Sequence, residues 1–505
     1  MTNVFRRTRI AMAVFAAAIL ATGLQPGPSR AAVGPATWHF PGDCNGQATL
    51  QGCITNVAQP GDTIEIVTDT TISETPTITK SLTLDSGSGF HGSISGGVHV
   101  TATSGTLDVS LHDLSFDGGI LVNLTGGSNH HLTLDHLTVT NGTTTGLAGL
   151  YLLTTVPATL DALSNTFHVT HGTATQMYLE AANDTGTTTF RVIGNHMNGH
   201  GGDNSFGGVQ LILDGSGAAR ADILNNSVWD VAGCGCVGGA GVYYRINDPA
   251  SDDVNVVGNT FERAVAGVFI QTLTTAGGHY TLDLFNNVIS HPTAQGVTID
   301  SFNNPSEFTL RAGNNDYFAL GQPNNFNGYP SGTGNLGLAP QYVSPTTGNL
   351  RLKATSPLIN KGVVCSPGGV AKVDAAGNFR LAGPTVDMGA FEHGAGLPTG
   401  IVFVGSPDGD SKSGTAGADI LCGYGGADFL NGKGGNDYVN GGGASDLVVG
   451  GPGADRIFGG TSGDTVCGRD GVNGNDYIDG GSGADDYRAD PGDTVLHVEH
   501  LGSCP

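Results

Sequence analysis

The sequence predicts an all-β protein built from two successive stacks of short parallel strands, and three observations lead to this prediction. Of its 505 residues, 83 are Gly and only 13% are charged, a composition typical of strands and turns and poor in helix. A phrase containing Asn recurs every 28 to 33 residues in the middle of the chain, and a nine-residue phrase containing Asp recurs near its C-terminal end. Repeats of fixed period indicate stacked units that each pair with their neighbours.

The longer repeat consists of strand phrases of the form apolar-x-Asn-x-apolar, such as Leu163 to Phe167 and Val257 to Phe261. Such a period fits one coil of three short strands, so residues 38–337 are predicted to form a parallel β-helix of about 8–11 coils. A β-sandwich is the alternative, but it gives no reason for an Asn to keep its phase. We interpret the Asn amides as structural hydrogen-bonding groups between coils. They lie 30, 31, 33, 28 and 28 residues apart, at Asn165, Asn195, Asn226, Asn259, Asn287 and Asn315.

Both ends of this β-helix are expected to be covered. A segment with Cys44 and Cys53 and a short helix over residues 50–57 precedes the first alternating strand. It resembles the N-terminal cap of secreted right-handed parallel β-helix proteins, which implies a right-handed helix. Residues 338–396 resemble the closing segment of many secreted bacterial β-helices and are expected to cover the last coil. Residues 397–413, rich in Gly, Pro and Ser, are predicted to be a linker.

Beyond this linker the pattern G-G-x-G-x-D-x-U-x is repeated, where U is apolar or aromatic, with one insertion at Gly468 to Gly474. Glycine pairs permit tight turns with inward-pointing carbonyls, and each Asp adds an anionic oxygen, which together make the all-oxygen environment that Ca²⁺ prefers. A flexible linker would not keep an apolar residue two positions after each Asp. The repeated carboxylates are those of Asp419, Asp428, Asp437, Asp446, Asp455, Asp464, Asp476 and Asp485.

These repeats resemble the RTX, or haemolysin-type, calcium-binding nonapeptide repeat. The resemblance implies that residues 414–495 form a parallel β-roll with two repeats per coil and with Ca²⁺ between turns on the same edge. The eight Asp residues are therefore the predicted calcium ligands. Without the ion, facing carboxylates repel each other and little apolar surface is buried, so we expect the roll to be disordered.

Charge and export signals narrow the partners and the location. A formal net charge of −24 argues against nucleic acid and anionic membranes as partners. Residues 1–32 carry Arg6, Arg7 and Arg9 ahead of an apolar run, which predicts a signal peptide and a secreted, extracellular protein, either released or held at the cell surface. No second apolar run is long enough to span a membrane. The sequence leaves the oligomeric state open.

Eight Cys residues in an exported chain suggest disulfide bonds. We expect Cys44 to pair with Cys53. Five repeats place Cys422 and Cys467 on opposite edges of the roll, beyond the Cα limit of roughly 7 Å for a disulfide, so Cys467 is predicted to pair with Cys504. No His or Cys cluster completes a zinc site around Cys234 and Cys236, and a loop disulfide arrangement is expected there.

The β-helix carries no intact catalytic motif. Its combination with RTX repeats resembles secreted mannuronan C5-epimerases, but their D-P-H-E phrase is absent, and Gly199-His200-Gly201 matches only the G-H-G phrase of polygalacturonase-like hydrolases. Lyase chemistry needs a basic side chain beside calcium-binding carboxylates. The candidates are Arg245 or Arg263 with Asp203, Asp230 and Glu262. Coil spacing predicts one shared flank for His196, His200, Asp203, Asp230, Glu262 and Arg263.

Two functions follow from these patterns. The favoured one is a secreted, non-catalytic calcium-binding protein whose β-helix binds cell-surface or matrix polysaccharide. The alternative is a calcium-dependent lyase, C5-epimerase or hydrolase acting on acidic polysaccharide. An ordinary solvated flank accounts for the polar candidate residues without chemistry, so the sequence favours the first function.

Overall fold

The computed structural model describes residues 35–504, with gaps at 142–147, 170–174, 184, 200–206, 232–238, 248–249, 273–277, 301–306 and 395. The predicted signal peptide, His200, Asp203, Cys234 and Cys236 therefore lie outside the described residues. The regular secondary structure of the described chain is almost entirely strand, and the strands pair almost entirely in parallel.

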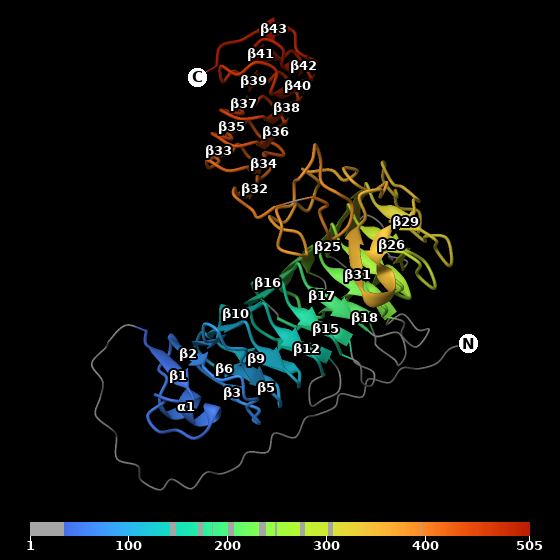
Figure 1. The fold of residues 1–505 in the computed structure, drawn as a ribbon. Helices are drawn as coiled ribbons and strands as arrows, with labels where there is room; N and C mark the ends of the chain where they lie inside the picture. The colour runs from blue at the N-terminus through green and yellow to red at the C-terminus, as the bar shows by residue number, and fades with distance from the viewer. Residues whose placement is uncertain are drawn as a thin grey trace.

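Residues 37–318 form the predicted parallel β-helix, in which successive coils contribute strands to three sheets named A, B and C (Figure 1). Sheet A contains β1 (Thr37–Phe40), β2 (Asp62–Ile66), β4 (Leu82–Ser86), β7 (Asp108–His112), β10 (His130–Asp135), β13 (Ala158–Leu163), β16 (Thr187–Ile193), β19 (Ala218–Leu224), β22 (Ser251–Val257), β25 (His279–Phe285) and β28 (Phe308–Gly313). Sheet B contains β5 (Ser93–Ile94), β8 (Ser115–Phe116), β11 (Thr138–Val139), β14 (Thr166–Phe167), β17 (His196–Asn198), β20 (Ser227–Trp229), β23 (Thr260–Glu262), β26 (Val288–Ser290) and β29 (Asp316–Phe318). Sheet C contains β3 (Thr77–Ile78), β6 (Val98–Thr103), β9 (Ile120–Gly126), β12 (Ala148–Thr154), β15 (Thr175–Ala181), β18 (Gly207–Leu213), β21 (Ala240–Ile246), β24 (Ala266–Thr272) and β27 (Val297–Ile299).

The predicted Asn residues form a buried ladder at the turn between sheets A and B. The backbone N–H of Asn195 donates to Oδ1 of Asn226 at 2.9 Å, and the Nδ2 of Asn226 donates to the carbonyl of Val192 at 2.8 Å. The same pattern joins each Asn to the next along the stack. Asn335, which the sequence pattern did not include, ends the ladder by accepting from the N–H of Asn315.

The N-terminal end of the β-helix is covered as predicted. Helix α1 (Leu50–Asn56) begins after Thr49, whose side chain accepts a hydrogen bond from the N–H of Gly52, and its buried residues pack on the first coil. The predicted disulfide between Cys44 and Cys53 is present, with their Cα atoms 5.3 Å apart.

Residues 320–336 form the last part of the β-helix, inside the predicted range 38–337, and the closing segment, residues 338–396, runs back along earlier coils instead of covering the last coil as expected. Isolated parallel bridges join Gln295 to Gln322 and Asp316 to Leu336, so residues 320–336 form a short final coil. The closing segment instead contains β30 (Tyr342–Ser344), the 3₁₀ helix η3 (Pro345–Thr347) and β31 (Asn349–Leu352) and then runs back along the earlier coils.

Hydrogen bonds to two coils fix the course of the closing segment. The Nδ2 groups of Asn286 and Asn225 donate to the carbonyls of Val363 and Val373, each at 2.7 Å. A row of apolar residues on the outer face of sheet A explains this course, because it needs a cover. Its members are Ile193, Leu224, Val257 and Phe285, which are aligned on neighbouring strands and pack around Ala371.

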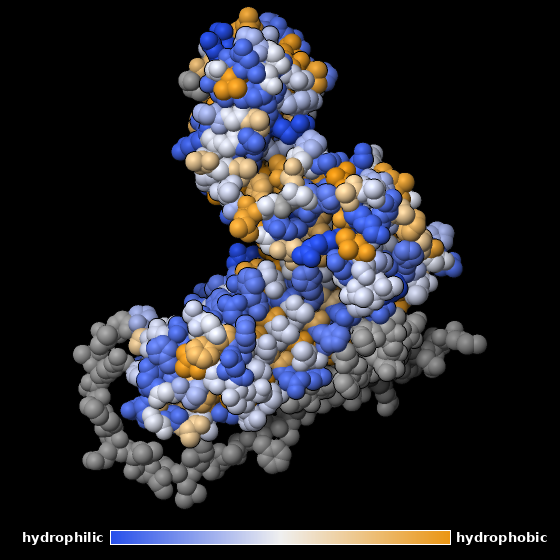
Figure 2. Space-filling model, viewed as in Figure 1, coloured by the Kyte–Doolittle hydropathy of each residue, from blue (hydrophilic) through white to orange (hydrophobic). Residues whose placement is uncertain are grey.

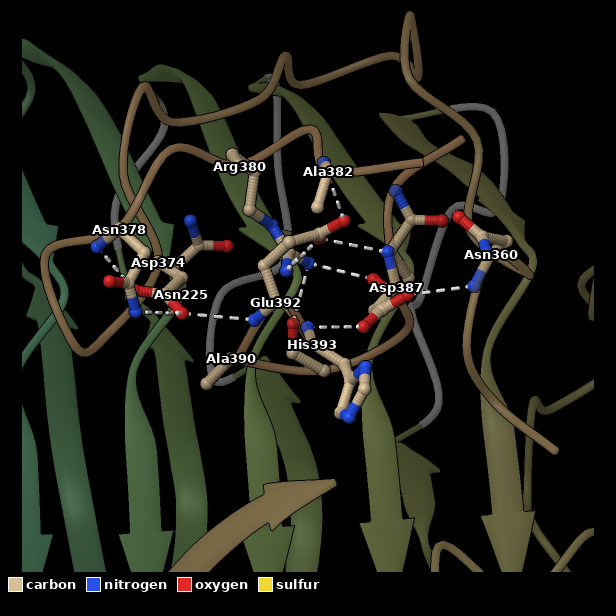
Figure 3. A network of polar contacts seen from close by, with 12 residues as sticks. Asn225, Asn360, Asp374, Asn378, Arg380, Ala382, Asp387, Ala390, Glu392 and His393 are labelled. Carbon is tan, nitrogen blue, oxygen red and sulfur yellow. Dashed lines mark hydrogen bonds and ion pairs between the residues drawn. The ribbon is translucent and has the colours of Figure 1, made fainter. Parts of the chain in front are cut away.

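A buried polar network holds the closing segment in shape (Figure 3). The side chain of Arg380, 1% exposed, donates to Glu392 Oε2 at 3.1 Å and to the carbonyls of Asp387 and Gly389 at 2.8 and 2.6 Å. Glu392 also accepts from the N–H of Ala382 at 3.1 Å. Buried charges need such partners, so this network fixes the loop around Ala382.

Residues 402–501 form a parallel β-roll of two six-stranded sheets. The first roll sheet contains β32 (Val402–Val404), β34 (Ile420–Cys422), β36 (Tyr438–Gly443), β38 (Arg456–Thr461), β40 (Tyr477–Ser482) and β42 (Thr494–Leu496). The second roll sheet contains β33 (Ser411–Ser413), β35 (Phe429–Asn431), β37 (Leu447–Val449), β39 (Thr465–Cys467), β41 (Asp486–Arg488) and β43 (His500–Leu501). The narrow core consists of the predicted U residues, among them Leu421, Leu430, Val439, Val448, Ile457, Val466 and Ile478.

The roll begins earlier than predicted. Within residues 397–413, expected to be a linker, β32 pairs with β34 and β33 pairs with β35. Gly405 and Asp410 keep the nine-residue phase, but Lys412 stands where the pattern requires an apolar residue. Its ammonium lies over the ring of Phe403, 5.5 Å from the centroid, and this contact makes a Lys tolerable at that position.

The roll is docked on the closing segment. Ile420, Cys422 and Tyr438 share a core with Val364 and Phe379 of the closing segment, and apolar residues gather at the base of the roll in the space-filling view (Figure 2). A disulfide that the sequence did not predict joins Cys365 to Cys422, with Cα atoms 5.6 Å apart. The predicted bond between Cys467 and Cys504 is present near the other end of the roll.

Candidate calcium sites and the surface of the β-helix

The eight predicted calcium ligands form two columns along the two edges of the roll, and each side chain is at most 4% exposed. In each column the N–H of one Asp donates to Oδ1 of the Asp one coil later. Asp419 donates to Asp437 at 2.8 Å, and Asp437 donates to Asp455 at 2.9 Å. The structure therefore places all eight carboxylates in equivalent positions, Asp419, Asp437, Asp455 and Asp476 on one edge and Asp428, Asp446, Asp464 and Asp485 on the other.

Three further carboxylates extend these columns. Asp410 donates its N–H to Asp428 Oδ1 at 2.7 Å, and Asp493 and Glu499 accept from the N–H groups of Asp476 and Asp485 at 3.3 and 2.7 Å. Asp410 lies nine residues before Asp419, so the nine-residue spacing could have identified it as a member of the columns. Asp493 and Glu499 lie 17 and 14 residues from their donors, and no nine-residue pattern identifies them.

The second carboxylate oxygen of these residues lacks a partner. Oδ2 is buried without a hydrogen-bond partner in seven of the eight, namely Asp428, Asp437, Asp446, Asp455, Asp464, Asp476 and Asp485. A buried anionic oxygen without a partner is strongly unfavourable, and a cation removes that cost. A cation is therefore expected beside these seven oxygen atoms.

Main-chain carbonyls converge on the same points. A Cβ placed at Gly423 would lie 2.1 Å from Asp428 Oδ2 and 2.3 Å from the carbonyl oxygen of Gly441. At Gly432 the corresponding distances to Asp437 Oδ2 and the carbonyl of Gly450 are 2.3 and 2.7 Å. Only Gly leaves this space open, and it is lined by oxygen atoms.

The donor set selects the type of ion. Within the described ranges, no group of three or more His, Cys, Asp and Glu side chains could hold a metal ion by itself. An ion in the turns would instead combine carboxylate oxygens with main-chain carbonyls. Such hard oxygen donors suit Ca²⁺, whereas Zn²⁺ and Cu²⁺ favour nitrogen and sulfur ligands.

Burial changes the acidity of the columns. It raises the pKa of Asp437 to about 7 and that of Asp455 to about 8, and the neighbouring carboxylates in the column add to both shifts. On the other edge, burial raises the pKa of Asp464 to about 7 and that of Asp446 to about 6. The columns thus hold protons near neutral pH unless a cation replaces them.

Comparison with known families agrees with this geometry. A family model described as the RTX calcium-binding nonapeptide repeat matches four times, at residues 404–439, 413–448, 440–473 and 470–496. The roll is an RTX calcium-binding module. The first match begins inside the segment expected to be a linker, in agreement with the strand pairing of the RTX roll.

The β-helix has distant structural neighbours. The crystal structure of pectate lyase Pel9A shares 12% identity with a TM-score of 0.36, covering 72% of this chain and 97% of that chain. The PL6 family alginate lyase AlyGC shares 10% identity with a TM-score of 0.24, covering 88% and 69%. No curated protein matches this chain. The assignment of the fold rests on the strand pairing described above.

The structure brings three of the catalytic candidates together. At the ends of β20 and β23, Arg263 Nε lies 3.2 Å from Asp230 Oδ1, and its Nη1 lies 3.9 Å from Glu262 Oε1. The guanidinium also stacks on Trp229 and donates to the carbonyl of Pro345 in the closing segment. These charges hold the closing segment on sheet B.

The remaining candidates have other surroundings. Glu262 is 2% exposed and accepts from Ser290 Oγ at 2.5 Å. His196 lies under the closing segment, with Nε2 2.7 Å from the carbonyl of Ala375 and the ring against Phe391, and burial lowers its pKa. Arg245 lies in sheet C, on a different face, 3.2 Å from Asp214.

Sheet C presents rows of aromatic and polar side chains that sequence reasoning missed. In one row, the registers align Tyr151, Tyr178, Gln210, Tyr243 and Phe269 on successive strands. The rings of Tyr151 and Tyr178 stack with centroids 5.0 Å apart. Alternating apolar and polar residues predicted the strands, but only the register shows which residues form one row.

A second row lies beside the first on sheet C. It aligns Glu180, Ile212, Arg245 and Gln271. The hydroxyl groups of Tyr178 and Tyr243 donate to Glu180 and Gln271 at 2.9 and 2.6 Å. Burial raises the pKa of Glu180, and repulsion from Asp214 adds to the shift.

Proposed function

We propose that this protein is a secreted, non-catalytic calcium-binding protein in which Ca²⁺ folds the RTX roll and sheet C of the β-helix binds a polysaccharide. The observation that carries the calcium part is the set of seven buried Oδ2 atoms without partners. Calcium would be held by the Asp columns and the glycine carbonyls, where it would neutralise buried charge. Among the residues that the structure describes, no helix has the length and apolarity to cross a membrane.

The rows on sheet C support the polysaccharide part. Neighbouring strands lie about 4.8 Å apart, so aromatic rings, amides and hydroxyl groups recur at that spacing along the axis. A polymer of sugar units presents its own groups at regular intervals, and aromatic and hydrogen-bonding side chains are suited to contact them. Tyr178, Tyr243 and Gln271 supply such groups on three strands.

The candidate charges on sheet B support a non-catalytic role. Arg263 is engaged by Asp230, Trp229 and Pro345, and the carboxylate of Glu262 is buried beneath Ser290. A general base must reach the proton that it removes. Groups committed to holding the closing segment are poorly suited to that task.

A binding assay tests this proposal. The full chain with Ca²⁺ is run by affinity electrophoresis through gels that contain neutral or uronate polysaccharides, and the products are examined for unsaturated or shortened chains. We expect retardation without product. Tyr178→Ala and Tyr243→Ala should weaken retardation, whereas Phe90→Ala, on the exposed Phe90 away from sheet C, should not.

One observation favours the alternative of a lyase, epimerase or hydrolase. Glu180, with its raised pKa, lies one row from Tyr178 and two strands from Arg245, a set that contains an acid, a hydroxyl group and a base. Product formation that is abolished by Arg245→Ala, Arg263→Ala or His200→Ala would replace our proposal with this one.

A further inference from the structure

A cavity of about 590 Å³ lies between the closing loop Leu381–Pro384 and the outer face of β38, β40 and β42 in the RTX roll. Its floor contains Arg456 and Tyr477, and its rim contains turn residues of one calcium edge. Sites for small ligands commonly have volumes of about 300–1,000 Å³. The cavity is separate from sheet C and from the flank of sheet B.

Two polar atoms of this lining are buried without partners. They are Nε of Arg456, a donor, and Oδ1 of Asn475, an acceptor. The described residues place no carboxylate in an ion pair with Arg456. Leaving such groups unpaired costs free energy, which a ligand with an acceptor for Arg456 and a donor for Asn475 would recover.

Aromatic rings hold the guanidinium in place. The Cζ of Arg456 lies 4.6 Å from the ring centroid of Tyr477 and 5.9 Å from that of Phe458. Stacking of this kind fixes the plane of the guanidinium and leaves its N–H groups directed sideways. The Nε and Nη groups then form the fork that binds a carboxylate through two parallel hydrogen bonds.

Bound calcium determines whether the lining of the cavity carries net negative or net positive charge. Asp437, Asp455 and Asp476 line its rim, and they belong to the column assigned to calcium above. With that column neutralised by Ca²⁺, Arg456 is the charged side chain left in the lining. This step rests on calcium binding by the roll.

The opposite wall is fixed in position. The N–H of Ala382 donates to Glu392 Oε1 at 3.1 Å, and Glu392 is paired with the buried Arg380 (Figure 3). The disulfide between Cys365 and Cys422 joins the closing segment to the second coil of the roll. Both walls are therefore held together, which favours a preformed site.

We propose that this cavity binds the carboxylate of an acidic sugar unit, with Arg456 as its anchor. The uronate carboxylate accepts from the guanidinium fork, and a ring hydroxyl donates to Oδ1 of Asn475. The proposal adds a second saccharide contact on the RTX roll, and it does not depend on the rows of sheet C.

The test measures binding of trigalacturonate and trimannuronate to the full chain by isothermal titration calorimetry in saturating Ca²⁺, with maltotriose as the neutral probe. We expect binding of at least one acidic trisaccharide and none of maltotriose. Arg456→Gln should weaken that binding about tenfold or more. Arg469→Gln, which removes a guanidinium with 64% side-chain exposure outside the cavity, should not change it.

Two further variants separate the possible outcomes. Ala454→Trp fills the exposed rim of the cavity and should block binding while calcium-induced circular dichroism stays normal, so it decides the matter if Arg456→Gln fails to fold. Tyr178→Ala, the sheet C variant that tests the proposed function, reports on that surface separately. Unchanged affinity in Ala454→Trp, equal binding of maltotriose, or loss of trisaccharide binding only in Tyr178→Ala would overturn the proposal.

Discussion

Individual glycines decide whether the turns of the RTX roll can hold an ion. Gly423 and Gly434 lie in successive repeats, but only at Gly423 does the space for a Cβ coincide with a carboxylate and a carbonyl oxygen. At Gly434 the nearest atom to a Cβ is a carbonyl oxygen at 3.7 Å. Two glycines that look alike in the sequence therefore have different roles.

Gly423→Ala should weaken calcium binding, because the added Cβ would displace Asp428 Oδ2 and the carbonyl of Gly441 from their common point. We expect the calcium concentration at the midpoint of roll folding to rise about tenfold or more. Circular dichroism during calcium titration measures this midpoint. Gly434→Ala is the matched control, and an equal shift in both variants would contradict the assignment.

The buried carboxylates also predict a dependence on pH. In the unfolded chain Asp has its ordinary pKa of 3.8, and burial raises that of Asp455 to about 8 in the folded roll. Between these values the folded, calcium-free roll binds more protons than the unfolded chain. Its stability is therefore present at low pH and is lost as the pH rises through the folded pKa values.

We expect the roll without calcium to be more structured at pH 5 than at pH 8, and calcium affinity to rise over the same interval because the ion replaces protons. Circular dichroism in chelator and calcium titrations at both pH values measure the two effects. In Asp455→Asn, the difference in calcium-free structure between pH 5 and pH 8 and the rise in calcium affinity should both be smaller. A calcium-free roll that becomes more structured with rising pH would contradict this account.

At the scale of elements, each module is organised by one ladder of side chains. The Asn ladder satisfies backbone groups at the turn between sheets A and B, and the Asp columns do the same at the edges of the roll while adding charge. The first ladder needs no cation because amides are neutral. The second one does, which explains why the two stacks should respond differently to calcium.

Removal of one rung tests the Asn ladder. Asn226→Ala leaves the N–H of Asn195 and the carbonyl of Val192 without their partners in a fully buried turn. We expect a loss of about 2–4 kcal/mol of stability, measured by chemical denaturation of the β-helix in chelator. Asn123→Ala, at an exposed position of sheet C, should change it little. A similar loss in both variants would contradict the structural role.

The sequence predicted those features that repeat. The Asn phase located the coils, the Asp phase located the eight carboxylates of the two columns, and Cys44 and Cys53 were close enough in sequence to be paired. Several features that do not recur at a fixed spacing in the sequence were not predicted or were predicted at the wrong position in the fold. Asp493 and Glu499 end the columns out of phase, and the course of the closing segment depends on an apolar row that appears only when Ile193 and Leu224 are aligned.

The candidate sites on the β-helix show the same limit. Coil spacing correctly brought Asp230, Glu262 and Arg263 near each other, but it could not reveal that the closing segment would fold over them. Arg245 was grouped with residues of another sheet, since a sequence period does not separate the faces of a coil. His200 and Asp203 lie outside the described residues.

At the scale of the whole molecule, the roll and the β-helix are joined through the closing segment and a disulfide. Chelation should erase the circular dichroism of the RTX roll and leave most of the β-helix intact.

The loop closed by Cys365 and Cys422 spans 57 residues, and such a bond typically stabilises by about 2–4 kcal/mol.

The double variant Cys365→Ser with Cys422→Ser should therefore require more calcium to fold the roll, because the chain loses a constraint that holds its second coil near the closing segment. A calcium titration followed by circular dichroism measures the shift. Cys44→Ser with Cys53→Ser is the control, and it should lower the stability of the β-helix without moving the calcium midpoint. An unmoved midpoint in the first variant would show that docking does not assist folding.

Both ladders have a direction. In each, the N–H of one coil depends on a side-chain oxygen of the coil that follows it, from Asn165 to Asn335 in the β-helix and from Asp410 to Glu499 in the roll. Losing a coil from the C-terminal side leaves buried backbone groups of the coil before it without partners, an N–H in both ladders and also a carbonyl in the Asn ladder, whereas losing one from the N-terminal side leaves only side-chain groups of the ladder without partners. The last coil of each stack is therefore needed to satisfy the backbone groups of the coil before it, and loss of structure is expected to begin at the C-terminal end.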